Sequence, residues 1–132
     1  MPRYTPIPVQ PTITASHSDM VELRWRKGGI TADFIIPDDE RHALRVTFGR
    51  AEIIRLLDEM PLSTEQDTRN EGLVAENFAY MVEGASFWEV QSWALKVSQP
   101  GLKHYRFITG WQCMDVISNC EPAFTVVPLT ND

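Results

Sequence analysis

The chain has 132 residues, 43% of them hydrophobic and 23% charged, and this composition excludes a fibrous or disordered protein and fits one globular domain. The formal net charge is −6, and positions 58 to 89 carry eight acidic residues and one base, Arg69. Because affinity for nucleic acids and anionic membranes depends on Lys and Arg, we expect neither as a partner.

The first 19 residues contain prolines at positions 2, 6, 8 and 11. Proline lacks a backbone N–H and disfavours helix, so we predict an extended arm over residues 1–19, followed by a single domain over residues 20–132. The apolar stretches are far shorter than the roughly 20 residues of a membrane span, and residues 1–19 contain no continuous apolar segment of a secretory signal. We therefore expect a cytoplasmic protein.

Residues 20–36 alternate between apolar and polar side chains on both sides of Gly28-Gly29. Two glycines between alternating segments are typical of a β-hairpin with a two-residue turn. With the turn at these glycines, Trp25 lies opposite Ala32 and the apolar side chains fall on one face. A third strand is predicted over residues 42–48, since its apolar residues also alternate.

The apolar period changes at residues 49–61, where helical spacing replaces alternation. We predict a helix that Pro61 ends, with Arg55 and Glu59 as an exposed i,i+4 ion pair. The polar residues 62–72 are predicted to form a mobile surface loop. The helical spacing is carried by four apolar residues: Ile53, Ile54, Leu57 and Met60.

Two further elements follow in residues 73–100. Aromatic and β-branched residues favour a strand over residues 73–83, although a helix would also place several of them on one face. A second helix is predicted from Ser86, because Ser86 and Glu89 have the spacing of a capping box, and Pro100 follows its end. Its apolar stripe would consist of Phe87, Val90, Ala94 and Val97.

A second hairpin is predicted around Gly110-Trp111. This turn places Phe107 opposite Met114, so that one side of the hairpin is apolar. A last strand follows at residues 122–128. The two hairpins together predict that five residues are buried on one side of a sheet: Trp25, Phe34, Val46, Phe107 and Met114.

These elements predict an α+β fold. We expect a single domain built on one twisted, mainly antiparallel sheet of about six or seven strands, with two helices covering its apolar face.

The polar side of the second hairpin is the first candidate site. Arg106 is predicted opposite Asp115, and His104 is their diagonal neighbour, so that His104 and Asp115 could form an acid–base pair of an enzyme. An Arg–Asp pair across two strands is also a common structural feature, and we consider a catalytic function the less favoured interpretation. Cys113 and His104 are offset by four residues, or roughly 13 Å, which excludes a nucleophile and base in contact.

No metal or other cofactor is expected. The two cysteines, Cys113 and Cys120, are seven residues apart, which matches no zinc pattern, and the histidines His17, His42 and His104 are scattered.

The tryptophans of the second predicted helix are the second candidate site. Trp88 and Trp93 lie off its apolar stripe, so they require cover by a loop, a ligand or another chain. Glu83 and Glu89 lie beside them, and Trp111 belongs to the same candidate binding set.

We therefore expect a non-enzymatic binding protein. Its acidic, Trp-containing surface would contact a basic protein partner or a second copy in a homodimer. The alternative is a sensor or carrier with a pocket for a cationic or aromatic small molecule between sheet and helices. An enzyme that uses His104 and Asp115 is the third hypothesis.

Overall fold

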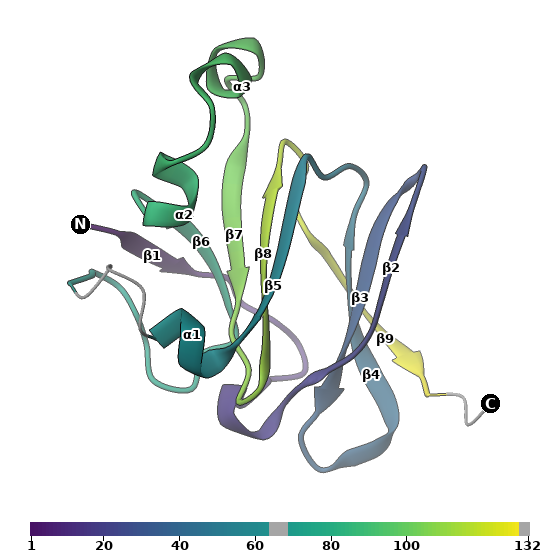
Figure 1. Ribbon diagram of the computed structural model, residues 1–132. Helices are drawn as coiled ribbons and strands as arrows, with labels where there is room; N and C mark the ends of the chain where they lie inside the picture. The colour runs from purple at the N-terminus through teal and green to yellow at the C-terminus, as the bar shows by residue number, and fades with distance from the viewer. Residues whose placement is uncertain (64–68, 130–132) are drawn as a thin grey trace.

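The computed structural model describes residues 1–63 and 69–129, which form a single, mostly antiparallel β domain (Figure 1). The first sheet has the order β1 (Arg3–Pro6), β6 (Ala79–Glu83), β7 (Lys103–Phe107), β8 (Gln112–Ser118) and β5 (Ile53–Asp58). The second sheet has the order β2 (Met20–Arg26), β3 (Gly29–Ile36), β4 (Asp39–Phe48) and β9 (Ala123–Pro128). The described helices are short: η1 (Ala15–His17), α1 (Glu59–Ser63), α2 (Ser86–Glu89) and α3 (Trp93–Ser98).

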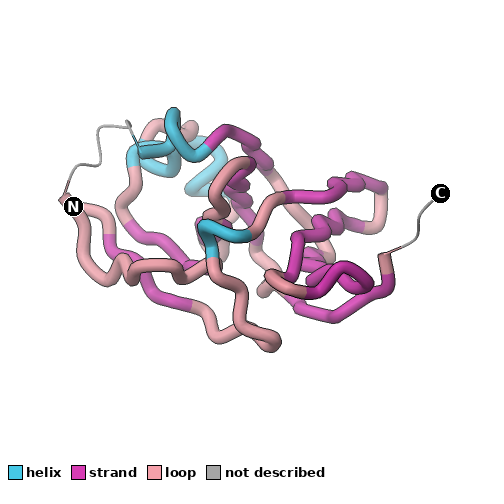
Figure 2. The backbone as a smooth tube through the Cα atoms, turned by 90° about the horizontal axis from the view of Figure 1, so that it is seen from below, coloured by secondary structure: helices cyan, strands magenta, loops and turns pink. Residues whose placement is uncertain are grey.

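The hydrophobic core lies between the two sheets, which corrects the predicted single sheet with helices on its apolar face. Phe34 of the second sheet contacts Phe78, beside the first sheet, with ring centroids 4.8 Å apart, and Phe48 contacts Tyr105 at 5.3 Å. The three α-helices lie beside the first sheet, on the side away from the second (Figures 1 and 2). Each sheet therefore buries the apolar face of the other. Strands whose residues alternate between apolar and polar favour this arrangement.

The helix predicted over residues 49–61 is wrong, because the central residues of this segment, 53–58, form β5. Ile54 pairs with Val116 of β8, and Arg55 pairs with Asp115. The β-branched Ile53 and Ile54 favour a strand, and the free edge of β8 provides a hydrogen-bonding partner that sequence periodicity does not show. Pro61 lies inside the short α1 rather than after a helix, and Arg55 binds Asp115 instead of the predicted Glu59.

The second predicted helix is broken into α2 and α3. Ala85 is the N-cap of α2, so the predicted capping box is not formed. Ser92 starts a new helix because its hydroxyl accepts a hydrogen bond from the backbone N–H of Leu95 at 3.1 Å. The continuous apolar stripe is consequently wrong, since the side chains of Val90 and Val97 are exposed.

The predicted hairpins are present, with one change in register. In β7–β8, Phe107 pairs with Met114 and Arg106 with Asp115, as predicted. In the first hairpin the turn lies one residue earlier, so that Trp25 pairs with Ile30. The shift of two residues in pairing preserves the faces.

Gly29 explains this earlier turn. It has a φ of +127°, and a Cβ there would lie 2.2 Å from the carbonyl oxygen of Phe48. Only glycine fits this first position of β3.

Four of the five residues predicted to be buried together are buried between the sheets, and the fifth is not. Trp25 is 59% exposed because it lies beside the turn at the end of β2, an edge strand. The buried four are Phe34, Val46, Phe107 and Met114.

Three predicted strands are confirmed in whole or in part. Residues 42–48 lie within β4, β6 occupies the end of the segment 73–83, and β9 lies within residues 122–128. The N-terminal segment contributes β1, which pairs with β6. Of the predicted loop 62–72, residues 64–68 lie outside the described residues. Within the described ranges, no helix is both long and apolar enough to cross a membrane.

Candidate functional site

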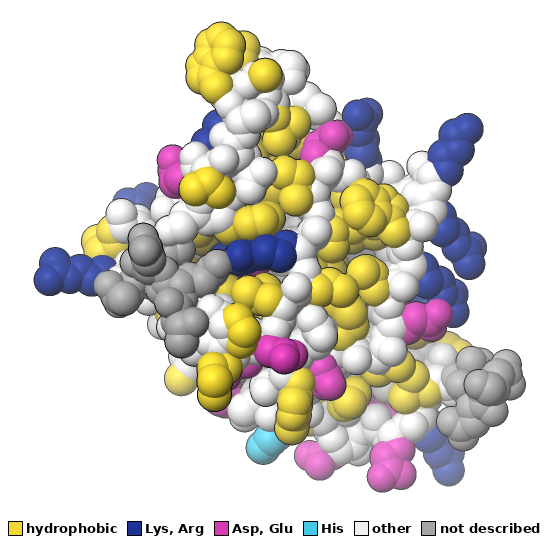
Figure 3. Space-filling view, viewed as in Figure 1, with side chains coloured by type: hydrophobic (Ala, Val, Ile, Leu, Met, Phe, Trp, Pro, Cys, Tyr) yellow, Lys and Arg dark blue, Asp and Glu magenta, His cyan; other side chains and the backbone are white. Residues whose placement is uncertain are grey.

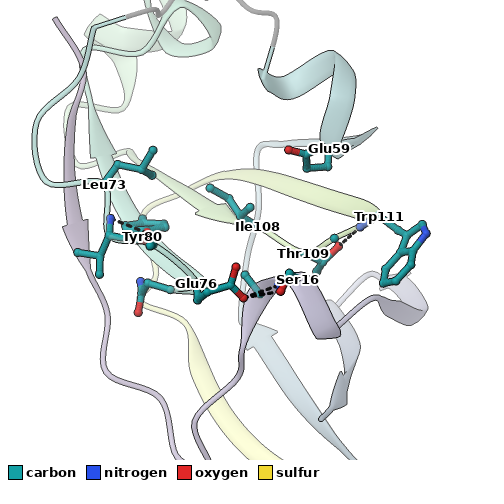
Figure 4. A pocket seen from close by; sticks show the side chains of 13 residues that line it. Ser16, Glu59, Leu73, Glu76, Tyr80, Ile108, Thr109 and Trp111 are labelled. Atoms are coloured by element: carbon teal, nitrogen blue, oxygen red, sulfur yellow. Dashed lines mark hydrogen bonds between the residues drawn. The ribbon is translucent and has the colours of Figure 1, made fainter.

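A cleft of about 670 Å³ lies beside one end of the first sheet (Figure 4). Its walls come from η1, the loop before β6, the β7–β8 loop and the start of α1. Leu73 and Tyr80 lie toward one end, and Trp111 stands at the other. We call it the Trp111 cleft. It brings together segments that are far apart in the sequence.

Glu76 supplies one carboxylate of the Trp111 cleft. Its Oε2 accepts hydrogen bonds from the hydroxyl of Ser16 and from the Ser16 backbone N–H, the latter at 3.2 Å. These bonds lower the pKa of Glu76, so that it is anionic at neutral pH. Glu76 also has a φ of +65°, a left-handed conformation that is costly for a residue other than glycine. The fold thus holds this carboxylate in one place.

Glu59 and Trp111 are fixed to each other through the backbone. The N–H of Glu59 donates to the carbonyl oxygen of Trp111 at 2.8 Å. Thr109 holds the turn before Trp111, because its hydroxyl accepts from the Trp111 N–H at 3.0 Å and donates to the Gln112 carbonyl at 2.7 Å. The indole of Trp111 is 59% exposed on this rigid turn.

The two sides of the Trp111 cleft meet at Gly110. A Cβ at this position would lie 2.7 Å from the carbonyl oxygen of Ser16, the residue that holds Glu76. The Gly110 N–H donates to Ser18 at 3.2 Å. The absence of a side chain at Gly110 therefore allows η1 and the β7–β8 loop to approach each other.

The chemistry of the Trp111 cleft suits a cation. Its lining includes two carboxylates, Glu59 and Glu76, an exposed indole and several aliphatic side chains, and none of the described lining residues is Lys or Arg. An indole face and a carboxylate both attract a positive charge. Trp111 was predicted as a binding residue. Glu59 and Glu76 were not, although the acidic segment contains both.

A second, smaller hollow of about 420 Å³ is lined by Trp88, Glu83 and Glu89, together with Lys103 and His104. Trp88 is half-buried there, and its indole already has a cationic neighbour.

That neighbour is Lys96. Its Nζ lies 5.0 Å from the centroid of the Trp88 ring and donates to the carbonyl oxygen of Glu89 at 3.0 Å. Trp93 lies on α3, 77% exposed, and does not line this hollow. The structure therefore separates the two tryptophans that were predicted to act together.

His104, Arg106 and Asp115 form a buried ionic cluster on the face of the first sheet that points away from the second. Oδ1 of Asp115 accepts from His104 Nε2 and from Arg106 Nε, both at 2.7 Å. Oδ2 accepts from Arg55 Nε at 2.9 Å and from its Nη2 at 2.6 Å. Nη1 of Arg106 donates to the hydroxyl of Tyr4 at 2.7 Å. Arg55 and Tyr4 were missed because they come from distant strands.

Burial decides the protonation of this cluster. Burial alone would raise the pKa of Asp115, but the hydrogen bond from His104 and the charge of Arg106 lower it to about 2. Burial lowers the pKa of His104 and outweighs its bond to Asp115. The imidazole is thus neutral and donates from Nε2.

The cluster is almost closed to solvent. His104 is 2% exposed and Asp115 is fully buried, and Nδ1 of His104 has no hydrogen-bond partner among the described residues. A general base must reach the proton that it removes. The pair that was considered catalytic therefore joins β7 to β8, and Arg55 and Tyr4 extend the cluster to β5 and β1.

Cys113 is an inert core residue. Its Sγ donates to the carbonyl oxygen of Thr109 at 3.7 Å, and burial raises the pKa of its thiol. A reactive cysteine requires a lowered pKa and access to solvent. Among the described residues, His, Cys, Asp and Glu side chains form no group of three that could hold a metal ion.

Comparison of the chain with protein-family models, curated proteins and solved structures finds no match. Function is therefore inferred from the residues of the Trp111 cleft and of the exposed surface.

Proposed function

We propose that the protein binds a small molecule that carries a cationic group, such as an alkylammonium, in the Trp111 cleft. The observation that supports this most is that Glu59, Glu76 and Trp111 surround one concave space whose described lining contains no Lys or Arg. A volume of about 670 Å³ is within the usual range for small-ligand pockets. The mostly aliphatic remainder of the wall would contact the uncharged part of the ligand.

The carboxylate of Glu76 would act as a preorganised counter-ion. Because Ser16 already fixes its position, little side-chain entropy is lost when a cation binds. Trp111 contributes the indole, and Glu59 adds a second negative charge from the start of α1.

The test is titration calorimetry with n-butylammonium and with choline. We expect Glu76→Gln and Trp111→Leu each to weaken binding by roughly 2- to 30-fold, which corresponds to about 0.5–2 kcal/mol. Glu40→Gln is the matched control, because Glu40 is an exposed carboxylate on β4 outside the cleft. The proposal would be contradicted if the wild type and the three variants bound with equal affinity, or if the control variant lost as much affinity as the other two.

A second candidate function, protein–protein contact, is supported by a different observation. Three large apolar side chains are exposed on the segment of α2 and α3: Val90 and Trp93 at 77% and Val97 at 55%. Of the two helices, α3 projects beyond the sheets at the top of Figure 1, and hydrophobic side chains gather at this tip in Figure 3. Exposed apolar groups gathered on a projecting element are typical of a contact surface.

Sedimentation analysis of the wild-type protein and of Trp93→Asp tests this candidate. If α3 mediates self-association, the variant is monomeric at concentrations where the wild type is dimeric. If the wild type is monomeric throughout, a homodimer through α3 is excluded.

A further inference from the structure

The outer face of the second sheet carries a hollow of about 290 Å³ over β2, β3 and β4. Its position follows from strand register, since Arg24 pairs with Thr31 and Thr31 with Thr47. Residues paired in this way have side chains on the same face. The opposite face of these strands supplies the core, so this row of polar side chains points outward. We call this hollow the arginine hollow.

Gly29 leaves the arginine hollow open toward the hairpin turn. It precedes Thr31 by two residues on β3, at the same parity of the strand, and pairs with Arg26. Gly29 thus lines the hollow without a side chain of its own. The close contact of Gly29 with the Phe48 backbone excludes any other residue at this position.

Two of the three arginines that line the hollow are held in place by carboxylates outside it. Nε and Nη2 of Arg24 bind Glu22 at 2.8 and 3.0 Å. Nε and Nη2 of Arg45 bind Asp33 at 2.8 and 3.0 Å. A guanidinium has five N–H groups, so three on each arginine are not used by these pairs. The third, Arg26, is exposed at the rim.

We propose that the arginine hollow binds a phosphoryl group of a small molecule. Its described lining contains Arg24, Arg26 and Arg45 and the hydroxyls of Thr31 and Thr47, but no Asp or Glu. Guanidinium groups match the oxygen atoms of phosphate in geometry and charge, and hydroxyls donate to the oxygens that remain. Lys and Arg side chains gather over this end of the molecule in Figure 3.

This site is independent of the Trp111 cleft. The cleft borders the first sheet and is lined by carboxylates, whereas the hollow lies on the second sheet and is lined by arginines. A ligand of one sign is therefore repelled from the other site, and failure of one proposal leaves the other unaffected.

Titration calorimetry with pyrophosphate tests the proposal. We expect saturable binding to the wild type and at least a fivefold weaker affinity for Arg26→Ala and for the double variant Thr31→Val/Thr47→Val. Arg41→Ala is the matched control, because Arg41 is an exposed arginine of β4 outside the hollow, and its affinity should remain within twofold. Thermal unfolding of each variant shows whether the fold is retained.

Three outcomes would overturn the proposal. One is the absence of pyrophosphate binding to the wild type. Another is an equal loss of affinity in Arg41→Ala, which would indicate general charge attraction. The third is much tighter binding of a 20-nucleotide single strand than of pyrophosphate, which would assign the arginines to a nucleic-acid surface.

Discussion

Nε2 of His104 lies 2.7 Å from Oδ1 of Asp115, and both side chains are almost completely buried. The same oxygen accepts from Arg106, and the other oxygen accepts from Arg55. One carboxylate of β8 thus serves three basic side chains from two neighbouring strands, β7 and β5. Because a buried charge is costly without partners, the cluster makes the stability of the first sheet depend on Asp115.

Replacement of Asp115 by Asn should destabilise the protein by about 3–5 kcal/mol, because the amide leaves the charge of buried Arg106 uncompensated. Urea denaturation at pH 7.5 measures the loss. Asp38→Asn is the matched control: Asp38 is exposed in the β3–β4 turn with a φ of +67°, which Asn tolerates, so little change is expected. A loss below about 1 kcal/mol in Asp115→Asn would show that the cluster is not a stabilising element.

Stability should fall in two steps as the pH decreases. His104 has a folded pKa below its ordinary value of 6.5. The unfolded chain therefore binds a proton that the folded protein resists, and stability decreases below about pH 6.5. Asp115 has a folded pKa of about 2 against 3.8, so its contribution is present above pH 3.8 and is lost between about pH 4 and pH 2. Urea midpoints measured from pH 8 to pH 2 test this.

The variant His104→Gln separates the two steps. It removes the titrating imidazole, so the first decrease near pH 6 should become shallower while the second remains. An unchanged slope between pH 7 and pH 5 would assign that step to another group.

The two glycines of the first hairpin should respond differently to alanine. Gly29→Ala places a Cβ 2.2 Å from the Phe48 carbonyl at a φ of +127°, and we expect a loss of more than about 2 kcal/mol. Gly28→Ala meets no atom within 4 Å and should change stability by less than about 0.5 kcal/mol. Thermal unfolding of both variants is the measurement. If the two substitutions destabilised the protein equally, the result would favour the turn at Gly28-Gly29 that the sequence predicted.

The two tryptophans of the helical segment should also differ. Trp93→Ala should leave the free energy of unfolding within about 0.5 kcal/mol, because the side chain is 77% exposed. Trp88→Ala should cost more, since Trp88 is half-buried and packs under Lys96. Acrylamide quenching of the single-tryptophan variants should be stronger for Trp93, and a reversed order would contradict the structure of α2 and α3.

Alternation of apolar and polar residues predicted both hairpins and their faces, and it predicted the register of the second hairpin but not that of the first. In residues 104–118 the pairing of Phe107 with Met114 and of Arg106 with Asp115 was predictable, because this register places large apolar side chains together on one face and the charged pair on the other. The meeting of His104 and Asp115 was predictable for the same reason. Trp111 could be placed in a turn, but the carboxylates opposite it could not.

The tertiary structure decided what pairs and packs over long distances. Ile53 and Ile54 have a spacing that suits helix and strand alike, and the edge of β8 made the segment a strand and brought Arg55 to Asp115. The second sheet, rather than two helices, covers the core. The periodicity of the sequence shows which face of an element is apolar, but it does not show which other element covers that face. Glu76 reaches the Trp111 cleft only because Ser16, 60 residues away, holds it there.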